Sequence, residues 1–267
     1  AEGTLVAGAQ VVLDVSGAER IRRRIRSFLE LGEHLVYRLA DNVRASDHDG
    51  PRALAGMMAA GTLAGLVVKY LLEGADTQTG SITIDTAAGA LFCTAEWHEG
   101  KVVSITANMG RPRLLRSKIP MNGDPAATCL EEEHVVGSRT LVLSAVSMGN
   151  PHAVLIVDDV DTADVAGLGP AIQRHPLFPE GVNVGFMQII DRSHVRLRVY
   201  ERGAGETQAC GSGSCAAVVA GIANNRLDKE VDVGLKRGHL SIKWDGEGGE
   251  VWMTGPAVMV FEGQIDI

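Results

Sequence analysis

The residue best suited to acid–base chemistry is Cys210, in the segment ACGSG. A glycine-rich turn there leads into small residues that are typical of a tightly enclosed helix, residues 214–224. Backbone N–H groups at a helix N-terminus favour an anion and lower the pKa of a thiol. We therefore expect a lowered thiol pKa at Cys210, with the N–H groups of Gly211 and Ser212 able to bind a carboxylate. Cys215, one turn further on, is expected to be a core residue.

Other polar residues precede this turn. Arg202 follows Glu201, and an arginine can bind a carboxylate through two parallel hydrogen bonds. Asn150 lies in MGNPH, after a predicted strand, and Asn183 lies in GVNVGF. An Asn-Pro pair at a strand end is also a common turn, so a purely structural role is the alternative for Asn150. His152 could likewise be a hydrogen-bond donor within the turn.

Composition limits the class of protein. The 267 residues carry 25 Lys and Arg against 33 Asp and Glu, a formal charge of −8, and 45% of them are apolar. These values exclude a disordered chain and argue against a nucleic-acid binder, which needs a basic excess. The sequence shows neither a membrane-spanning apolar run nor a signal peptide, so we expect a cytoplasmic protein. The four cysteines have no CxxC spacing, which predicts neither a disulfide scaffold nor a zinc site.

The elements that must position these residues occur twice. One stretch runs from Asp49 to about Leu115, and the other from Glu201 to about Phe261. Each has a turn of small residues, a small-residue helix, two strands around a glycine-containing turn, and a third strand after a hairpin. In the first stretch the third strand shows apolar alternation at Val103, Ile105 and Ala107, the period of a half-buried strand. The repeat predicts two related halves of α+β class, each a barrel-like sheet around a central helix.

Several segments together resemble one protein family. MGNPH, FPEGVNVGF, RLRVYERGAGETQACGSGSCAAV and MTGPAV closely resemble diaminopimelate epimerases, the amino-acid epimerases of bacterial lysine and peptidoglycan synthesis. The resemblance is specific from about Val146 to the C-terminus. ITIDTAAG and ITANMGRPRL still resemble the family's first-domain strands, whereas residues 1–80 match only in outline.

The resemblance implies a fold and an assembly. It implies two pseudo-symmetric domains with the active site in the cleft, and a homodimer that uses neither pyridoxal phosphate nor a metal, hence no cofactor. The last strand of the family usually returns to the first domain. With a linker near residues 116–125, we expect a first domain over 1–118, joined by 257–267, and a second domain over 119–256 that carries Cys210.

The resemblance also implies roles for residues. A thiolate removes the α-proton of LL- or meso-diaminopimelate, and a thiol on the opposite face returns one. Cys210 matches one of that pair, and Gly211 and Ser212 match the residues that hold the α-carboxylate. The residues matched to recognition of the distal amino-acid end are Asn150, Asn183, Glu201 and Arg202.

The first domain departs from the family pattern. No cysteine precedes Cys93, which lies in the middle of a predicted strand. The family's first-domain Cys-Gly-Asn-Gly turn falls at residues 58–61, and the internal repeat places Met57 or Met58 opposite Cys210. Methionine has no titratable proton, so it cannot act as an acid or a base.

Three functions follow from these observations. The first is epimerisation of LL- and meso-diaminopimelate, which predicts that Cys210→Ala abolishes turnover. The second is a catalytically impaired or binding-only member of the family, because the first-domain cysteine is absent. The third is a thiol-independent isomerase of the kind related to phenazine biosynthesis, with His48 or Asp47 as the acid. The intact ACGSG turn argues against the third.

Overall fold

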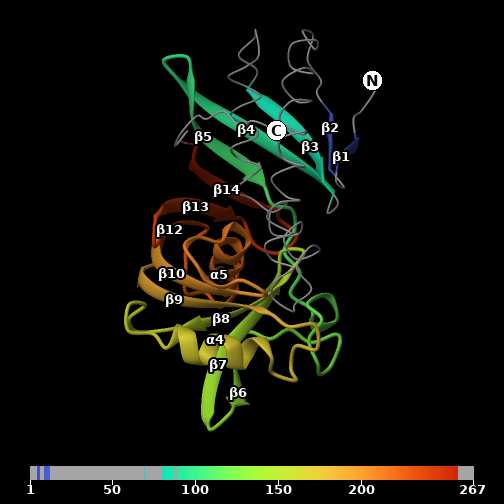
Figure 1. The fold of residues 1–267 in the computed structure, drawn as a ribbon, viewed down its shortest axis with the longest axis vertical. Coiled ribbons are helices and arrows are strands. Elements are labelled where there is room, and N and C mark those ends of the chain that lie inside the picture. Colours follow the sequence, from blue (N-terminus) through green and yellow to red (C-terminus); the bar gives the residue numbers. More distant parts are fainter. Residues whose placement is uncertain (1–4, 7–8, 13–68, 70–79, 87–88, 258–267) are drawn as a thin grey trace, which may run out of the picture. The chain divides into compact units, whose positions relative to one another are not determined.

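The computed structural model describes residues 5–6, 9–12, 69, 80–86 and 89–257 of the chain (Figure 1). It divides into two compact units. Unit 1 consists of Ala1–Ala107 and Gly255–Ile267, and unit 2 of Asn108–Thr254. Most of the predicted first helix, residues 62–73, and positions 47, 48, 57 and 58 lie outside the described residues.

Unit 1 contains an antiparallel sheet in the order β1–β2–β3–β4–β5. The β4–β5 hairpin closes through Glu99 and Gly100, whose φ angles of 49° and 76° are both positive, as the tight hairpin turns that match strand twist require. The strands are β1 (Leu5–Val6), β2 (Ala9–Val12), β3 (Ser81–Thr86), β4 (Gly89–His98) and β5 (Lys101–Asn108).

The buried face of β5 differs in part from the predicted one. Ile105 and Ala107 are buried as expected, but Val103 is 40% exposed and Val102 is buried instead. Glu96 pairs with Ser104 whereas Trp97 pairs with Val102, so Val103 is the extra residue of a β-bulge. A bulge reverses the inward and outward alternation, and a simple period of two does not predict it.

Unit 2 is built on a mixed sheet in the order β14–β13–β12–β10–β9–β8–β7–β6, with β11 paired to β10. The pairs β8–β9 and β10–β12 are parallel and the other described pairs are antiparallel. The elements are η1 (Arg116–Lys118), β6 (Glu132–Val136), β7 (Arg139–Ser147), β8 (Pro151–Ile156), α4 (Val165–Gln173), β9 (Asn183–Asp191), β10 (His194–Glu201), β11 (Gly205–Thr207), α5 (Gly211–Ala223), β12 (Glu230–Leu235), β13 (Gly238–Trp244) and β14 (Val251–Pro256).

Helix α5 is enclosed by the strands of unit 2 (Figure 1). It contacts β7, β8, β9, β10 and β13, and every residue from Ser212 to Gly221 is buried. Only small residues allow such close packing: a Cβ atom on Gly221 would lie 2.3 Å from Leu227 Cδ1. The predicted helix in this half, and the α+β class with a sheet curved around it, are therefore confirmed.

A second apolar core lies on the other side of the central strands. Helix α4 contacts β9 and β10, and Asp164 caps its start by accepting a hydrogen bond from the Gly167 N–H at 3.0 Å. On β9, Phe186 belongs to this second core whereas Met187 belongs to the core around α5. The central strands are apolar on both faces because each face is covered, as is usual for parallel pairs.

The boundary between the units lies earlier than residue 118. Arg113 and Ser147 exchange two backbone hydrogen bonds of 2.9 Å, which tie the chain after β5 to unit 2. Residues 108–118, which the sequence assigned to the first domain, therefore belong to unit 2. Of the segment 257–267, only Ala257 is described, and its N–H donates to Val103 O at 3.2 Å within unit 1.

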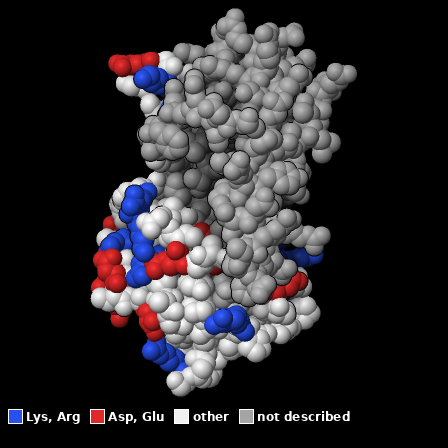
Figure 2. All heavy atoms as spheres, in the orientation of Figure 1, with Lys and Arg blue, Asp and Glu red and all other residues white. Residues whose placement is uncertain are grey.

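Acidic and basic side chains lie next to one another on the described part of the surface (Figure 2). In unit 2, Arg196 pairs with Asp161 at 2.8 Å and Arg226 with Glu131 at 2.9 Å. The positive charge of each of these arginines is thus balanced locally. No helix within the described part of the chain has the length and apolarity that crossing a membrane requires.

Candidate functional site

Cys210 is the N-cap residue of α5. Its backbone is extended, and its carbonyl accepts the first intrahelical hydrogen bond from the Ser214 N–H at 2.9 Å. The Ser214 hydroxyl donates to the same carbonyl at 2.9 Å. A Cβ atom on Gly213 would lie 3.2 Å from Cys210 Sγ, so glycine at 213 lets the sulfur lie over the first turn of the helix. The sequence placed the thiol at this helix start correctly.

The expected lowering of the Cys210 pKa is wrong. The pKa of the Cys210 thiol is raised to about 12, mainly by burial and in addition by the negative charge of Glu201, which also accepts a hydrogen bond from the thiol. The Gly213 N–H and the Ser212 hydroxyl act in the opposite direction but do not outweigh burial. Only 7% of Cys210 is exposed, so loss of hydration disfavours the thiolate more than the helix N-terminus favours it. The free protein therefore holds Cys210 as a neutral thiol.

A line of polar side chains connects β8 to the start of α5. The Asn150 Nδ2 group donates to Ser212 Oγ at 3.3 Å, and Ser212 Oγ lies 3.7 Å from Cys210 Sγ. Asn150 Oδ1 lies 3.1 Å from His152 Nε2, so the ring carries its proton on Nε2 and donates it. Complete burial, with the charge of Arg202, lowers the pKa of His152 to about 3, so the ring is neutral. Asn150 thus links the fixed His152 ring to the first turn of α5.

Both the amide nitrogen and the amide oxygen of Asn183 form hydrogen bonds. Its Nδ2 group donates to Pro151 O at 3.2 Å, and its Oδ1 atom accepts from the Arg202 backbone N–H at 2.8 Å. The side chain is buried, with 5% exposed. In this structure Asn183 joins β8 to the end of β10, and so fixes the backbone that presents Glu201 and Arg202.

Glu201 and Arg202 differ in how they are held. Glu201 accepts a hydrogen bond from the Thr207 hydroxyl across the β10–β11 hairpin and lies beside the Cys210 thiol. The exposed Arg202 donates from Nη1 to Glu180 O at 2.7 Å. The N–H groups of Gly211 and Ser212 belong to the first turn of α5, which has no carbonyl partner for them within the helix.

The structure thus brings one group of predicted residues close to the thiol, with Gly211 next to it at the start of α5, and connects Arg202 through Asn183. The group close to the thiol is Cys210, Ser212, Asn150 and Glu201. Sequence reasoning undervalued His152 and missed Thr207. β8 is buried continuously from Pro151 to Leu155, and a histidine inside such an apolar run, beside Asn150, could have indicated the first; Thr207 gives no such signal.

One group of side chains in the described part of the chain has the spacing of metal ligands. It consists of Cys129, Glu132 and His134. Cys129 belongs to the second apolar core, not to the core that surrounds α5. The absence of CxxC spacing, which predicted no zinc site, gives no signal for a group with a single cysteine.

The fold is similar to that of known racemases and epimerases. The structure of a hydroxyproline epimerase from Agrobacterium vitis superimposes with a TM-score of 0.55 at 19% identity, over 73% of this chain and 63% of that one. That of a probable proline racemase from Agrobacterium radiobacter superimposes with a TM-score of 0.57 at 17% identity, over 78% and 67%. These similarities define the fold, an α+β fold that isomerases use.

Sequence comparison identifies the family. The family model for diaminopimelate epimerase matches residues 144–260. The diaminopimelate epimerase of Nitrosomonas europaea is 53% identical over 191 residues, covering 72% of this chain and 67% of that protein. That of Ectopseudomonas mendocina is 47% identical over 197 residues, covering 74% and 69%. The chain belongs to the diaminopimelate epimerase family, as its motifs predicted.

Proposed function

We propose that this protein is an isomerase that interconverts LL- and meso-diaminopimelate, a step of lysine and peptidoglycan synthesis, without a cofactor. The observation that carries the proposal is the position of Cys210. Its thiol lies at the N-terminus of a buried helix, beside Glu201 and Ser212. Membership of the family supports the choice of substrate.

Cys210 is proposed to act first as the acid. Because its pKa is about 12, the thiol keeps its proton in the free protein. A group on the opposite face of the substrate removes the α-proton. The Cys210 S–H bond then breaks as the new Cα–H bond forms, which leaves a thiolate on Cys210 and inverts the centre. In the reverse direction Cys210 must start as the thiolate, which the substrate ammonium and the N–H groups of α5 would stabilise.

The carbanion requires strong electrostatic stabilisation, because an amino-acid α-proton is very weakly acidic. We assign the α-carboxylate to the N–H groups of Gly211 and Ser212, at the positive end of the α5 dipole. The distal amino-acid end is assigned to Asn150, Asn183, Glu201 and Arg202. For Asn183 the engaged amide favours an indirect contribution, through the Arg202 backbone that it holds.

The direct test is exchange of the α-proton in D₂O. Reduced protein is incubated with LL-diaminopimelate, and proton NMR follows loss of the α-proton and growth of the meso isomer. We expect deuterium entry with inversion, and its loss in Cys210→Ala. Cys215→Ala is the matched control, because Cys215 is a fully buried core residue of the same helix. Full activity in Cys210→Ala would falsify the proposed role.

A second candidate is a binding-only member of the family. The observation that favours it is the absence of any cysteine before Cys93, which is itself buried in β4 with a pKa raised to about 11 by burial. Calorimetry that detects diaminopimelate binding, together with no exchange in D₂O, would support it. Met58→Cys then tests the cause: gain of exchange would assign the deficit to the missing first-domain thiol.

The proposal also covers the oligomeric state, the cellular location and the two domains. We propose a cytoplasmic homodimer that binds neither nucleic acid nor membrane, on the basis of family membership and the formal charge of −8. We also propose that the two compact units, Ala1–Ala107 with Gly255–Ile267 and Asn108–Thr254, act as the two epimerase domains. Light scattering after size-exclusion chromatography measures the mass, and a monomer at micromolar concentration would contradict the dimer.

A further inference from the structure

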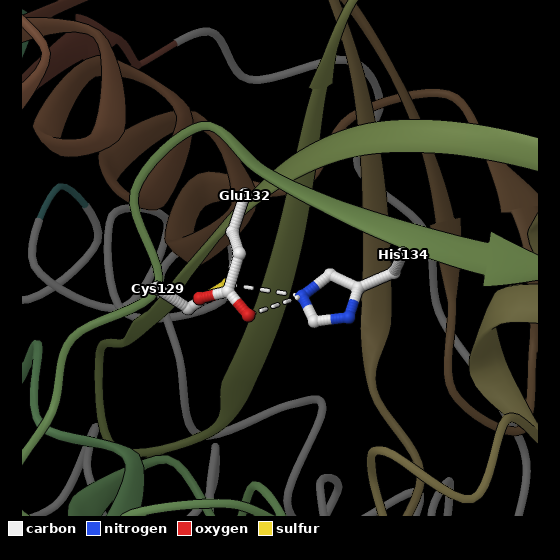
Figure 3. Close-up of side chains that lie close together, drawn as sticks. All are labelled: Cys129, Glu132 and His134. Atoms are coloured by element: carbon white, nitrogen blue, oxygen red, sulfur yellow. Dashed lines mark hydrogen bonds and ion pairs between the residues drawn. The ribbon is translucent and has the colours of Figure 1, made fainter.

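The group formed by Cys129, Glu132 and His134 lies at the start of β6 (Figure 3). Glu132 and His134 are alternate residues of this strand, so both side chains leave it on the same face. Cys129 precedes the strand, and its carbonyl accepts from the Ala145 N–H of β7 at 2.8 Å. A short backbone segment, anchored to β7, therefore presents all three side chains.

The distances suit a tetrahedral ion. Cys129 Sγ lies 3.7 Å from His134 Nε2, and Glu132 Oε1 lies 3.3 Å from the same atom. All three candidate ligand atoms lie within 4.8 Å of one another. Zinc bonds of about 2.3 Å to sulfur and about 2.0 Å to nitrogen or oxygen, at tetrahedral angles, give ligand separations of about 3.3–3.5 Å. A small adjustment of side chains would therefore accommodate the ion.

The geometry does not suit a catalytic relay. In a thiol–imidazole–carboxylate relay the thiol contacts one ring nitrogen and the carboxylate contacts the other. Here both contacts end on Nε2 of His134, as the two dashed lines in Figure 3 show. Sulfur, oxygen and nitrogen thus converge on one point.

The surroundings orient the group. Arg116 forms an ion pair with Oε2 of Glu132, the oxygen that does not face His134. An outer partner of this kind fixes the direction of a metal-binding carboxylate. Cys129 is fully buried, whereas the side chains of His134 and Glu132 are 13% and 42% exposed. An ion would therefore enter from the side of the carboxylate and imidazole, and a fourth, water-bearing position would face that side.

We propose that Cys129, Glu132 and His134 form a site for Zn²⁺ or a similar borderline-soft divalent cation, outside the catalytic machinery. The donor set is one sulfur, one nitrogen and one oxygen, which suits zinc rather than Mg²⁺ or Ca²⁺. On binding, the Cys129 S–H bond breaks, a metal–sulfur bond forms, and the proton is released to solvent. The thiolate and the carboxylate then neutralise the two charges of the ion, and the ion ties the segment before β6 to the strand.

Cobalt spectroscopy tests the proposal. The reduced, metal-free full chain is titrated with Co²⁺, and we expect the near-ultraviolet sulfur-to-cobalt band together with the visible bands of a tetrahedral site, at one ion per chain. Addition of Zn²⁺ should remove both signals. Cys129→Ala should abolish the sulfur band. Glu132→Gln and His134→Gln should weaken binding about 10-fold to 100-fold, by analogy with losses around metal sites.

Two control variants make the result specific. Cys210→Ala should keep the cobalt bands, because the proposed ion is bound by the other thiol. His239→Gln should also keep them, since His239 pairs with Asp232 at 2.6 Å as another histidine–carboxylate pair. Circular dichroism confirms that each variant is folded. Absence of a sulfur band in the unmodified protein, or a band that Cys210→Ala removes and Cys129→Ala keeps, would overturn the proposal.

Discussion

Unit 2 contains two thiols in similar settings that point to different chemistry. Cys210 and Cys129 are both buried. Their pKa values are raised to about 12 and about 11, mainly by burial and in part by the charge of a nearby glutamate. Their other neighbours differ. Cys210 faces backbone N–H groups at a helix start and the hydroxyl of Ser212, whereas Cys129 lies beside the imidazole of His134.

The difference teaches that burial alone does not decide the role of a thiol. At Cys210 the neighbouring groups other than Glu201 are hydrogen-bond donors, which can bind an anionic substrate and stabilise a thiolate. At Cys129 the imidazole and the carboxylate of Glu132 offer lone pairs that converge with the sulfur, an arrangement suited to a cation. One site is therefore proposed to move a proton, and the other to hold an ion.

The largest expected effect is a difference in epimerase activity between the Cys210 and Cys129 variants. Cys210→Ala should lower conversion of the LL isomer to the meso isomer by about 10²-fold to 10⁴-fold, the usual contribution of a general acid–base group. Cys129→Ala should leave this conversion within about twofold in metal-free buffer, because its side chain lies in the other apolar core. Rates of conversion followed by NMR at saturating substrate measure both. Equal losses in the two variants would show that the comparison of the sites is wrong.

A second expectation concerns stability. Asn183→Ala should lower the free energy of unfolding by about 1–3 kcal/mol, because it removes a buried amide that bonds Pro151 O and the Arg202 N–H. Elsewhere in unit 2, Asn122→Ala should cost less, since Asn122 is exposed and its side chain donates to Pro176 O. Urea unfolding compares the two. A larger loss of unfolding free energy in Asn122→Ala than in Asn183→Ala would contradict the view that the buried amide contributes more.

For the second half of the molecule, the sequence predicted the secondary structure around Cys210 better than the pKa of its thiol. The motif around Cys210 placed the thiol at a helix start, since small residues and a glycine turn leave few alternatives. It did not predict the raised pKa, which depends on β10 bringing Glu201 beside the thiol and on the enclosing strands. Local patterns carry no information on such long-range burial.

Other features that the sequence did not predict also depend on contacts between separate segments. The bulge at Val103 depends on the pairing of β5 with β4 and not on either strand alone. The convergence at Cys129 depends on how the segment before β6 folds against β7, although its three residues lie close in sequence. The fold class was predictable from the repeat and the small-residue helix, whereas these contacts required the tertiary structure.

A third expectation compares the histidines of the two regions. His152 is neutral in the folded protein because its pKa is lowered from 6.5 to about 3. Between these two pH values the unfolded chain binds a proton at His152 and the folded chain does not. Stability from this group is therefore present above pH 6.5 and is lost as pH falls from 6.5 toward 3. His152→Gln should flatten the dependence of the unfolding free energy on pH more than His134→Gln, because His134 is only partly buried and shifts less. Unfolding at several pH values tests this, and an unchanged slope in His152→Gln would contradict it.

The smallest expected effect concerns the negative charge of Glu201 beside Cys210, the proposed catalytic thiol. Glu201→Gln removes a negative charge that raises the Cys210 pKa, so the pKa falls and the thiolate fraction at a given pH increases. Because only the thiolate is alkylated, iodoacetamide should modify Cys210 severalfold faster in this variant, as followed by peptide mass spectrometry at pH 8. Glu132→Gln is the matched control: it removes the corresponding charge beside Cys129 and should leave the Cys210 rate unchanged. Slower alkylation of Cys210 in Glu201→Gln would mean that Glu201 assists ionisation of the thiol, in which case Cys210 would serve first as the base.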